Sequence, residues 1–214
     1  KILIKNGTKV FEMYGASEIG TVTNIMFNKK NKKYRSVGKS CSNAKIKILS
    51  ENNKFQPPNK IGEIVCSTPL RFKKYLDMSK QTKNSFYKNY FKTGDIGYLD
   101  KDNYLYYKGR KKNIIKVSGI NVYPEDIEKI IIKNKNIKEI SALGIKDKTG
   151  KEKIIICMVL KNKKITKESI FDYCSKKLAT FQQPHQIFFL NSLPKTSLGK
   201  INLFNLKKKI IQKL

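Results

Sequence analysis

The sequence of 214 residues contains no tryptophan, one histidine and only three arginines. It has no apolar run of 18 residues, so no stretch predicts a membrane-spanning helix. The four cysteines are scattered without C-x-x-C spacing, and the single His185 offers them no partner for a zinc site. We therefore expect reduced, structurally idle thiols and no zinc centre.

No secretory hydrophobic region opens the chain, which favours an intracellular protein, cytoplasmic or organellar. The first residue is Lys rather than Met. We therefore expect that the natural N-terminus, with any targeting segment, precedes it.

Positive charge dominates the composition, with 46 basic residues against 16 acidic ones and a net charge of +30. Such a charge is typical of proteins that bind nucleic acid or anionic membranes. However, 43 of the basic residues are lysines, whereas specific readers of phosphates and bases favour the arginine fork. The lysines are also spread along the whole chain. We interpret them as a solvated surface and keep polyanion binding as an alternative.

The pattern of apolar residues changes near residues 109–112. Before it the chain reads mostly as strands, and after it strands alternate with helices. This predicts an α+β protein of two units, residues 1–109 and 110–214. Strands are expected at 10–13, 44–48, 62–66, 104–108, 113–117, 137–145, 154–160 and 186–190, and helices at 77–86, from Pro124, at 167–178 and at the lysine-rich end. Residues 14–20 and 28–33 are expected to be loops, with a turn at Gly7, and Ile170, Phe171, Cys174 and Leu178 are expected to form the inner helix face.

The stretch 93–128 combines glycines with charged neighbours. Gly94 precedes Asp95, and Gly109 precedes Arg110 between two strand-like runs. A purely structural hairpin needs the turn glycine but has no use for this concentration of charge. The pattern therefore favours a site built on a hairpin.

Three separated motifs follow one another in the chain: YGASE at 14–18, TGD at 93–95 with GRKKNIIKVSGINVYPEDIE at 109–128, and LPKTSLGKI at 193–201. Each alone is weak, but in this order they resemble the superfamily of acyl-CoA synthetases, luciferases and peptide-synthetase adenylation domains. The resemblance covers nearly the whole chain. It implies the β-rich end of a large AMP-binding domain in residues 1–109, and a small mobile C-terminal domain in 110–214.

The resemblance implies a nucleotide site in the first unit. Tyr14 and Gly15 match residues that pack along adenine, Ser17 stands where a threonine usually contacts phosphate, and Glu18 matches the carboxylate that helps to hold Mg²⁺. From the residues alone, Glu18 is equally well explained as a carboxylate that caps a turn.

The same resemblance assigns Asp95 to the ribose hydroxyls, Arg110 to the ribose and phosphate region, and Lys200 to the adenylation step. Without the motif, Asp95 and Arg110 are equally explained as an ordinary ion pair, and Lys200 as one surface lysine among many.

The family uses two arrangements of its small domain, one for adenylation and one for transfer to a thiol. The hinge position corresponds to Lys112. Lys116, Ser118 and Gly119 correspond to the face used in the second step, where a glycine leaves room for the thiol arm of CoA. A turn glycine is the alternative explanation of Gly119.

These matches predict an ATP-dependent carboxylic acid–CoA ligase that uses ATP, Mg²⁺ and CoA and forms an acyl-AMP intermediate. Residues 111–128 favour the fatty-acid type.

The family's phosphate loop and acyl pocket lie upstream of its first motif, so we expect the chain to represent roughly the last two fifths of such an enzyme and to need that missing part of the same polypeptide for activity. The alternatives are another adenylate-forming enzyme, or a remnant that binds a nucleotide or a polyanion. Three positions depart from the family's pattern: Ser17, Asn103 in place of a turn glycine, and the less basic segment 181–184.

Overall fold

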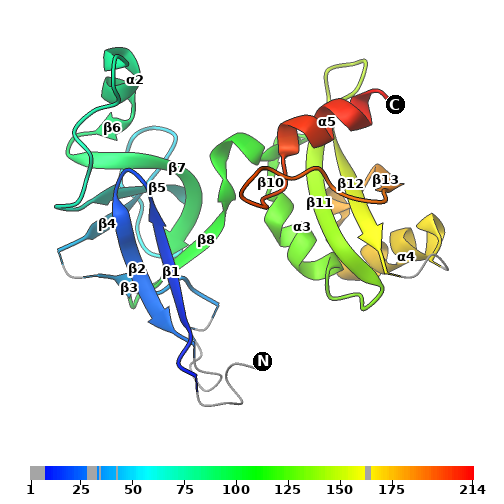
Figure 1. Cartoon of the computed structure of the whole chain (residues 1–214), viewed down its shortest axis with the longest axis horizontal. Helices are drawn as coiled ribbons and strands as arrows, with labels where there is room; N and C mark the ends of the chain where they lie inside the picture. Colours follow the sequence, from blue (N-terminus) through cyan, green and yellow to red (C-terminus); the bar gives the residue numbers. More distant parts are fainter. Residues whose placement is uncertain (1–7, 28–32, 34, 42, 162–164) are drawn as a thin grey trace. The chain divides into compact units, whose positions relative to one another are not determined.

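The computed structural model describes residues 8–27, 33, 35–41, 43–161 and 165–214 (Figure 1). The chain divides into two compact units, Lys1–Lys111 and Lys112–Leu214, so the division falls two residues after the position expected from the sequence. Strands predominate in the first unit, and strands and helices mix in the second. The α+β class predicted from the sequence is confirmed.

The first unit is built from two antiparallel sheets. One has the order β1-β2-β3, and the other has the order β4-β5-β7-β6, with β8 also paired to β7. Apolar side chains from both sheets form one buried cluster, which includes Ile19, Val22, Ile64, Phe91 and Leu105. The elements are β1 (Phe11–Ala16), β2 (Gly20–Met26), β3 (Lys39–Ser40), β4 (Lys45–Leu49), β5 (Gly62–Ser67), α2 (Ser79–Asn84), β6 (Phe86–Tyr87), β7 (Tyr90–Leu99) and β8 (Leu105–Arg110).

The second unit is organised around a three-stranded sheet, in which β11 and β12 are antiparallel and β13 is parallel to β12. Alternate residues of β12 enter two different buried clusters, as expected for a strand covered on both faces. Helices α3 and α4 supply one cluster, and α5 supplies the other. The elements are η1 (Lys111–Asn113), β9 (Ile115–Val117), β10 (Ile120–Val122), α3 (Pro124–Ile131), β11 (Ile137–Lys146), β12 (Glu152–Leu160), α4 (Lys167–Lys177), η2 (Thr180–Gln182), β13 (Gln186–Phe189) and α5 (Leu203–Ile211).

The helices of the second unit begin where the sequence supplies caps. Pro124 occupies the first turn of α3, where its missing N–H costs no hydrogen bond. The side chain of Thr166 accepts a hydrogen bond from the Ser169 N–H at the start of α4, and Asn202 does the same for Asn205 at the start of α5. These local signals mark where each helix starts, and packing determines which face is buried.

The structure corrects several expectations. Phe171 is not on the inner face of α4: its side chain is 36% exposed, because the buried positions Ile170 and Cys174 are four residues apart and Phe171 lies to one side of that line. Residues 14–16 continue β1 rather than forming a loop, and 93–95 lie within β7. Residue 113 belongs to a 3₁₀ turn, so β9 begins only at Ile115.

Strands β2, β3, β6, β7 and β10 had no counterpart in the predicted elements, since they are short or carry polar residues. The turn expected at Gly7 and most of the loop expected at 28–33 lie outside the described residues. All four cysteines are free thiols, as expected. No helix in the described ranges is long and apolar enough to cross a bilayer.

Candidate functional site

Asp95 and Arg110 are fifteen positions apart in the sequence and lie opposite each other where β7 pairs with β8. The guanidinium Nε lies 3.0 Å from Oδ1 of Asp95, and Nη1 donates to the Thr93 carbonyl at 3.0 Å. Gly94, which lies between Thr93 and Asp95 in the sequence, has φ of +70°, a conformation that favours glycine. The expectation that strands 104–108 and 113–117 flank a turn at Gly109 is wrong, because Gly109 and Arg110 lie within β8 and β9 pairs with β10 instead. The two charges are aligned by the hairpin of β7 and β8.

Tyr14 of β1 meets this pair, since its hydroxyl donates to Oδ2 of Asp95 at 2.8 Å. Burial is the main cause that raises the pKa of Asp95, and the Tyr14 hydrogen bond and the Arg110 charge oppose it. The pKa of Tyr14 is also raised, by burial and then by the charge of Asp95, so the proton stays on the phenol. Oδ1 accepts no hydrogen bond from the described residues, which leaves a buried acceptor beside the arginine.

Glu18 lies in the turn between β1 and β2, next to the exposed Ser17. Its Oε1 accepts a 2.9 Å hydrogen bond from the hydroxyl of Tyr75. Gly15 lies at a bulge in the β1–β2 pairing, where a Cβ would come within 2.2 Å of the Gly20 carbonyl oxygen. The first motif therefore needs its glycine for close strand packing, and the packing sets the position of Glu18.

Glu63 of β5 is a second carboxylate in this region. It accepts from the Gly94 N–H at 3.3 Å and pairs with Lys111 at 2.7 Å. Sequence reasoning did not select Glu63 or Tyr75. One acidic residue within the otherwise apolar segment 62–66 was the available signal for Glu63, and nothing local marks Tyr75, because its contact with Glu18 spans 57 residues.

Glu18, Glu63, Tyr75 and Arg110 line a cavity of about 370 Å³ in the first unit. Its lining residues do not include Tyr14, Gly15, Ser17 or Asp95. It unites the first two motifs, because Glu18 from one and Gly94 and Arg110 from the other all line it. The carboxylates in its lining suit a cation, and the guanidinium suits a phosphate or ribose. Among the described residues no group of three or more His, Cys, Asp or Glu could hold a metal alone. The cavity therefore fits Mg²⁺ only where substrate phosphates supply most of its ligands. Its lining consists of Ala16, Glu18, Glu63, Tyr75, Asn84, Ser85, Phe91, Lys92, Thr93, Gly94 and Arg110.

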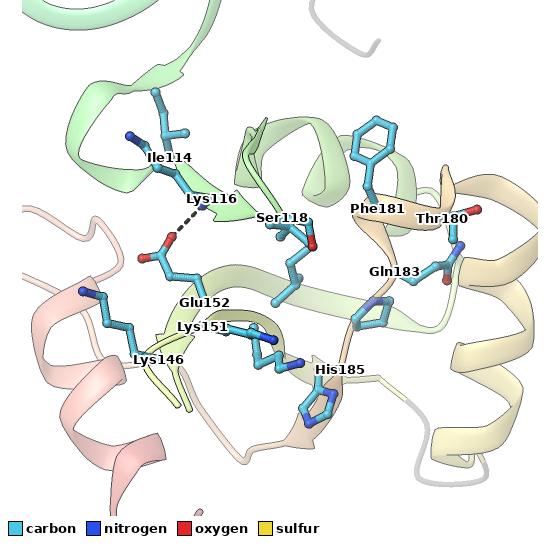
Figure 2. A pocket seen from close by; sticks show the side chains of 15 residues that line it. Ile114, Lys116, Ser118, Lys146, Lys151, Glu152, Thr180, Phe181, Gln183 and His185 are labelled. Carbon is cyan, nitrogen blue, oxygen red and sulfur yellow. Dashed lines mark hydrogen bonds between the residues drawn. The ribbon is translucent and has the colours of Figure 1, made fainter. Parts of the chain in front are cut away.

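The second unit has its own hollow, of about 730 Å³, lined by Lys116 and Ser118 (Figure 2). The backbone N–H of Lys116 donates to Oε2 of Glu152 on one side, and Phe181 and His185 lie on the other (Figure 2). Four lysines stand against this single carboxylate, so the hollow favours an anion. The lysines are Lys116, Lys146, Lys151 and Lys153.

Gly119 lies beside this hollow, in the two-residue turn between β9 and β10. Ser118 and Gly119 have φ of 49° and 83°, as a tight hairpin turn requires. A Cβ on Gly119 would meet nothing within 4 Å. Within this structure the turn alone accounts for the glycine.

Lys112 and Lys200 are both exposed. Lys112 is in the 3₁₀ turn η1, at the start of the second unit. Lys200 follows Gly199, whose φ is +76°, and its carbonyl accepts from the Thr196 N–H at 2.7 Å. The loop thus holds the backbone of Lys200 in a tight turn and leaves its side chain in solvent, apart from the two cavities described above.

Comparison with known proteins agrees with this arrangement. The family profile described as "AMP-binding enzyme" matches residues 1–76, and that of the "AMP-binding enzyme C-terminal domain" matches residues 126–200. The 2-succinylbenzoate–CoA ligase of Enterococcus faecalis is 33% identical, over 92% of this chain and 40% of its own length. The long-chain-fatty-acid–CoA ligase FadD13 of Mycobacterium tuberculosis is 28% identical, over 94% of this chain and 40% of its own.

Among solved structures, o-succinylbenzoate coenzyme A synthetase (MenE) from Bacillus subtilis, in complex with ATP and magnesium ion, superimposes with a TM-score of 0.86 at 29% identity. That match covers 96% of this chain and 42% of the other. The chain thus spans about two fifths of the length of the relatives it matches. With two family profiles in the expected order and the same fold, the chain belongs to the adenylate-forming superfamily of AMP-binding enzymes.

Proposed function

We propose that the protein containing this chain is a carboxylic acid–CoA ligase, which uses ATP to form an acyl-AMP and then transfers the acyl group to CoA. One observation carries the proposal: Glu18, Gly94 and Arg110, from two distant motifs, line one cavity in the first unit. Its relatives include CoA ligases for aromatic and for long-chain acids.

In this proposal the first unit binds the nucleotide. Asp95 accepts hydrogen bonds from the ribose hydroxyls. Arg110, whose Nε lies 3.0 Å from Oδ1 of Asp95, lies beside it for the ribose and phosphate. Tyr14 and Gly15 flank the adenine, and Ser17 contacts phosphate. Glu18 contributes one carboxylate to Mg²⁺, which neutralises the phosphate charge when bound.

Lys200 acts in the adenylation step. The substrate carboxylate attacks the α-phosphorus of ATP, the bond to pyrophosphate breaks, and the lysine stabilises the charge that develops between the two. Lys200 is exposed on a turn, so its side chain is available for that position.

The test uses the full-length enzyme and measures its two half-reactions separately. Lys200→Ala is expected to abolish carboxylate-dependent ATP–pyrophosphate exchange and to leave thioester formation from supplied acyl-AMP largely intact. Lys195→Ala, in the same loop, is the matched control, and it should affect neither half-reaction strongly. Equal loss of both half-reactions in Lys200→Ala would show that the role given to Lys200 is wrong.

The second unit serves the thiol-transfer step in this proposal. Residues 110–214 form the mobile lid domain and Lys112 its hinge, which agrees with the division of the chain between residues 111 and 112. Lys116, Ser118 and Gly119 belong to the face used in this step. The basic hollow beside them suits the phosphates of CoA.

We further propose a fatty acid as substrate, supported by the resemblance of residues 111–128 to that type of ligase. A panel of fatty and aromatic acids, assayed with the full-length enzyme, tests this. Higher kcat/KM for an aromatic acid would contradict the fatty-acid assignment without affecting the ligase assignment.

The isolated chain of 214 residues is expected to lack pyrophosphate exchange, since the resemblance places the phosphate loop and acyl pocket upstream of Tyr14. Measurable exchange by this chain alone would refute that expectation. A remnant that only binds a nucleotide is the second candidate, and an in-frame phosphate loop in the upstream gene sequence would exclude it.

A further inference from the structure

Helix α5 carries an exposed stripe that the proposed chemistry does not use. Phe204, Lys207, Lys208 and Ile211 follow the spacing i, i+3, i+4, i+7, so they share one face of the helix. Phe204 is 79% exposed and Ile211 is 53% exposed. We call these four residues the α5 stripe.

The other side of α5 is already occupied. Leu206 and Ile210 are fully buried in the cluster that packs against the three-stranded sheet. The α5 stripe is therefore not needed to hold the helix in place. Two large apolar side chains remain in water on the same face as two lysines, which a purely structural helix does not require.

The charge around α5 has one sign. The last 42 residues, from Tyr173 onward, contain eight lysines and no arginine, aspartate or glutamate. A nearby carboxylate outside this segment, Glu152, lines a small cavity with Phe204 and Lys207, and its Oε2 accepts the Lys116 N–H. The exposed face thus combines apolar side chains with a local excess of positive charge.

We propose that the α5 stripe is a contact surface for anionic membranes. Lysines beside an exposed apolar face suit the boundary between acidic headgroups and acyl chains, where the lysine stems lie along the apolar region and the ammonium groups reach the headgroups. A second copy of the chain is a poorer fit, because the same positive segment would face itself. Nucleic acid is also a poorer fit, because Phe204 and Ile211 would gain nothing from phosphates and the segment lacks arginine. The proposal does not depend on the catalytic roles assigned above.

Vesicle binding tests it directly. The chain is sedimented with phosphatidylcholine vesicles, with and without phosphatidylglycerol, at low and at physiological ionic strength. We expect binding only to the acidic vesicles. Lys207→Gln with Lys208→Gln is expected to weaken that binding by roughly ten-fold or more, because each lysine near an acidic surface contributes strongly. Phe204→Gln with Ile211→Gln is also expected to weaken it several-fold.

Matched controls lie in the first unit. Lys80→Gln with Lys83→Gln removes the same charge from exposed positions of α2, and Leu76→Gln removes an apolar side chain that is 80% exposed. Neither control should change vesicle binding by more than about two-fold. The two lysines and Leu76 lie outside the α5 stripe, and salt screens the charge of remote lysines.

The absence of tryptophan supplies a second readout that does not require loss of function. Phe204→Trp places the single tryptophan in the α5 stripe, and its emission should shift to shorter wavelength on acidic vesicles and be quenched by brominated lipid chains. Phe55 lies in the first unit and is 40% exposed, and a Phe55→Trp variant should show neither effect.

Three results would overturn the proposal. The first is equal binding to neutral and acidic vesicles, and the second is an unshifted Phe204→Trp emission on vesicles that bind. The third is loss of binding only in the lysine variants, with duplex DNA competing for the same sites, which would identify a nonspecific polyanion surface instead.

Discussion

The two candidate binding regions, one in each unit, handle charge differently. In the first unit, Asp95 is buried and its partners are fixed: Arg110 at 3.0 Å and the Tyr14 hydroxyl at 2.8 Å. In the second unit, four lysines and one glutamate surround a hollow, and Lys116, Lys146 and Lys151 are exposed. The first region depends on single, well-placed atoms, and the second on the sum of several exposed charges.

This difference predicts different sensitivities. Removing one partner of a buried charge costs a large interaction free energy, and salt screens such a charge only weakly. Exposed lysines each contribute little, act cumulatively and are screened by salt. The two proposed ligands, a nucleotide and CoA, should therefore respond to different substitutions and to different conditions.

The largest effect is expected for Asp95→Asn in the full-length enzyme. The amide keeps the shape but loses the charge that Arg110 and the ribose hydroxyls would share, so affinity for a non-hydrolysable acyl-adenylate analogue should fall by about ten-fold to a hundred-fold. Calorimetry measures it. Asp172→Asn, an exposed carboxylate on α4 paired with Lys176, is the control and should leave that affinity unchanged. Unchanged affinity in Asp95→Asn would remove the carboxylate from the nucleotide site.

The next effect concerns the basic hollow. Lys146→Gln with Lys151→Gln is expected to raise KM for CoA by about ten-fold at low salt, with a smaller effect at high salt, because Coulomb attraction is screened. Initial rates with supplied acyl-AMP report this without the adenylation step. A salt-independent effect, or an equal one in Lys80→Gln with Lys83→Gln, would show that the hollow does not bind CoA through charge.

A smaller effect is expected for Tyr75→Phe, which removes the hydrogen bond to Glu18 but keeps the ring. Loss of one such bond to a charged group should raise the Mg²⁺ concentration needed for half-maximal adenylation by about five-fold. The rate at saturating Mg²⁺ should change little if Tyr75 acts by positioning Glu18. Tyr173→Phe, whose hydroxyl reaches the Ile130 carbonyl in the other unit, is the control. A loss that saturating Mg²⁺ does not restore would contradict the positioning role.

The smallest effect concerns stability in the second unit. Burial, with repulsion from Glu125 in addition, raises the pKa of Glu128 to about 7, although its Oε1 accepts the Ala142 N–H at 2.8 Å. Between the ordinary glutamate pKa and this value the folded chain binds the proton that the unfolded chain has lost. The free energy of unfolding of the second unit should therefore fall as pH rises through this window, by on the order of 1 to 3 kcal/mol.

Glu128→Gln isolates this contribution, because its amide oxygen still accepts the Ala142 N–H and does not titrate. Denaturant unfolding from pH 5 to pH 8 should show a weaker pH dependence in the variant than in the native chain. Identical pH dependence would show that Glu128 does not cause it.

Much of the fold follows from local signals. The continuous apolar run of β12 marks a strand that is buried on both faces, and Pro124 marks the start of α3. Phe171 shows the limit, because a helix pattern gives the buried direction but not the width of the buried face. Strand β7 was missed because the polar and glycine residues at 93–95 read as a turn, and only its pairing with β5 and β8 makes it a strand.

The site divides in the same way. Asp95 and Arg110 were selected because each adjoins a glycine, and they form a direct ion pair. An ordinary ion pair was the alternative explanation, so their nucleotide-binding roles, which came from the resemblance, remain predictions. Glu63 and Tyr75 act through contacts that join residues far apart in the sequence, which no local pattern records. The proposed roles of Lys112, Lys116, Ser118, Gly119 and Lys200 came from the resemblance, and they remain predictions.

One experiment tests the contrast between the two regions most directly: affinity for the acyl-adenylate analogue and KM for CoA, both measured in Asp95→Asn and in Lys146→Gln with Lys151→Gln. We expect the first variant to lose affinity for the analogue with little change in KM for CoA, and the lysine variant to do the reverse. Equal changes of both quantities in both variants would contradict the assignment of the two ligands to two regions.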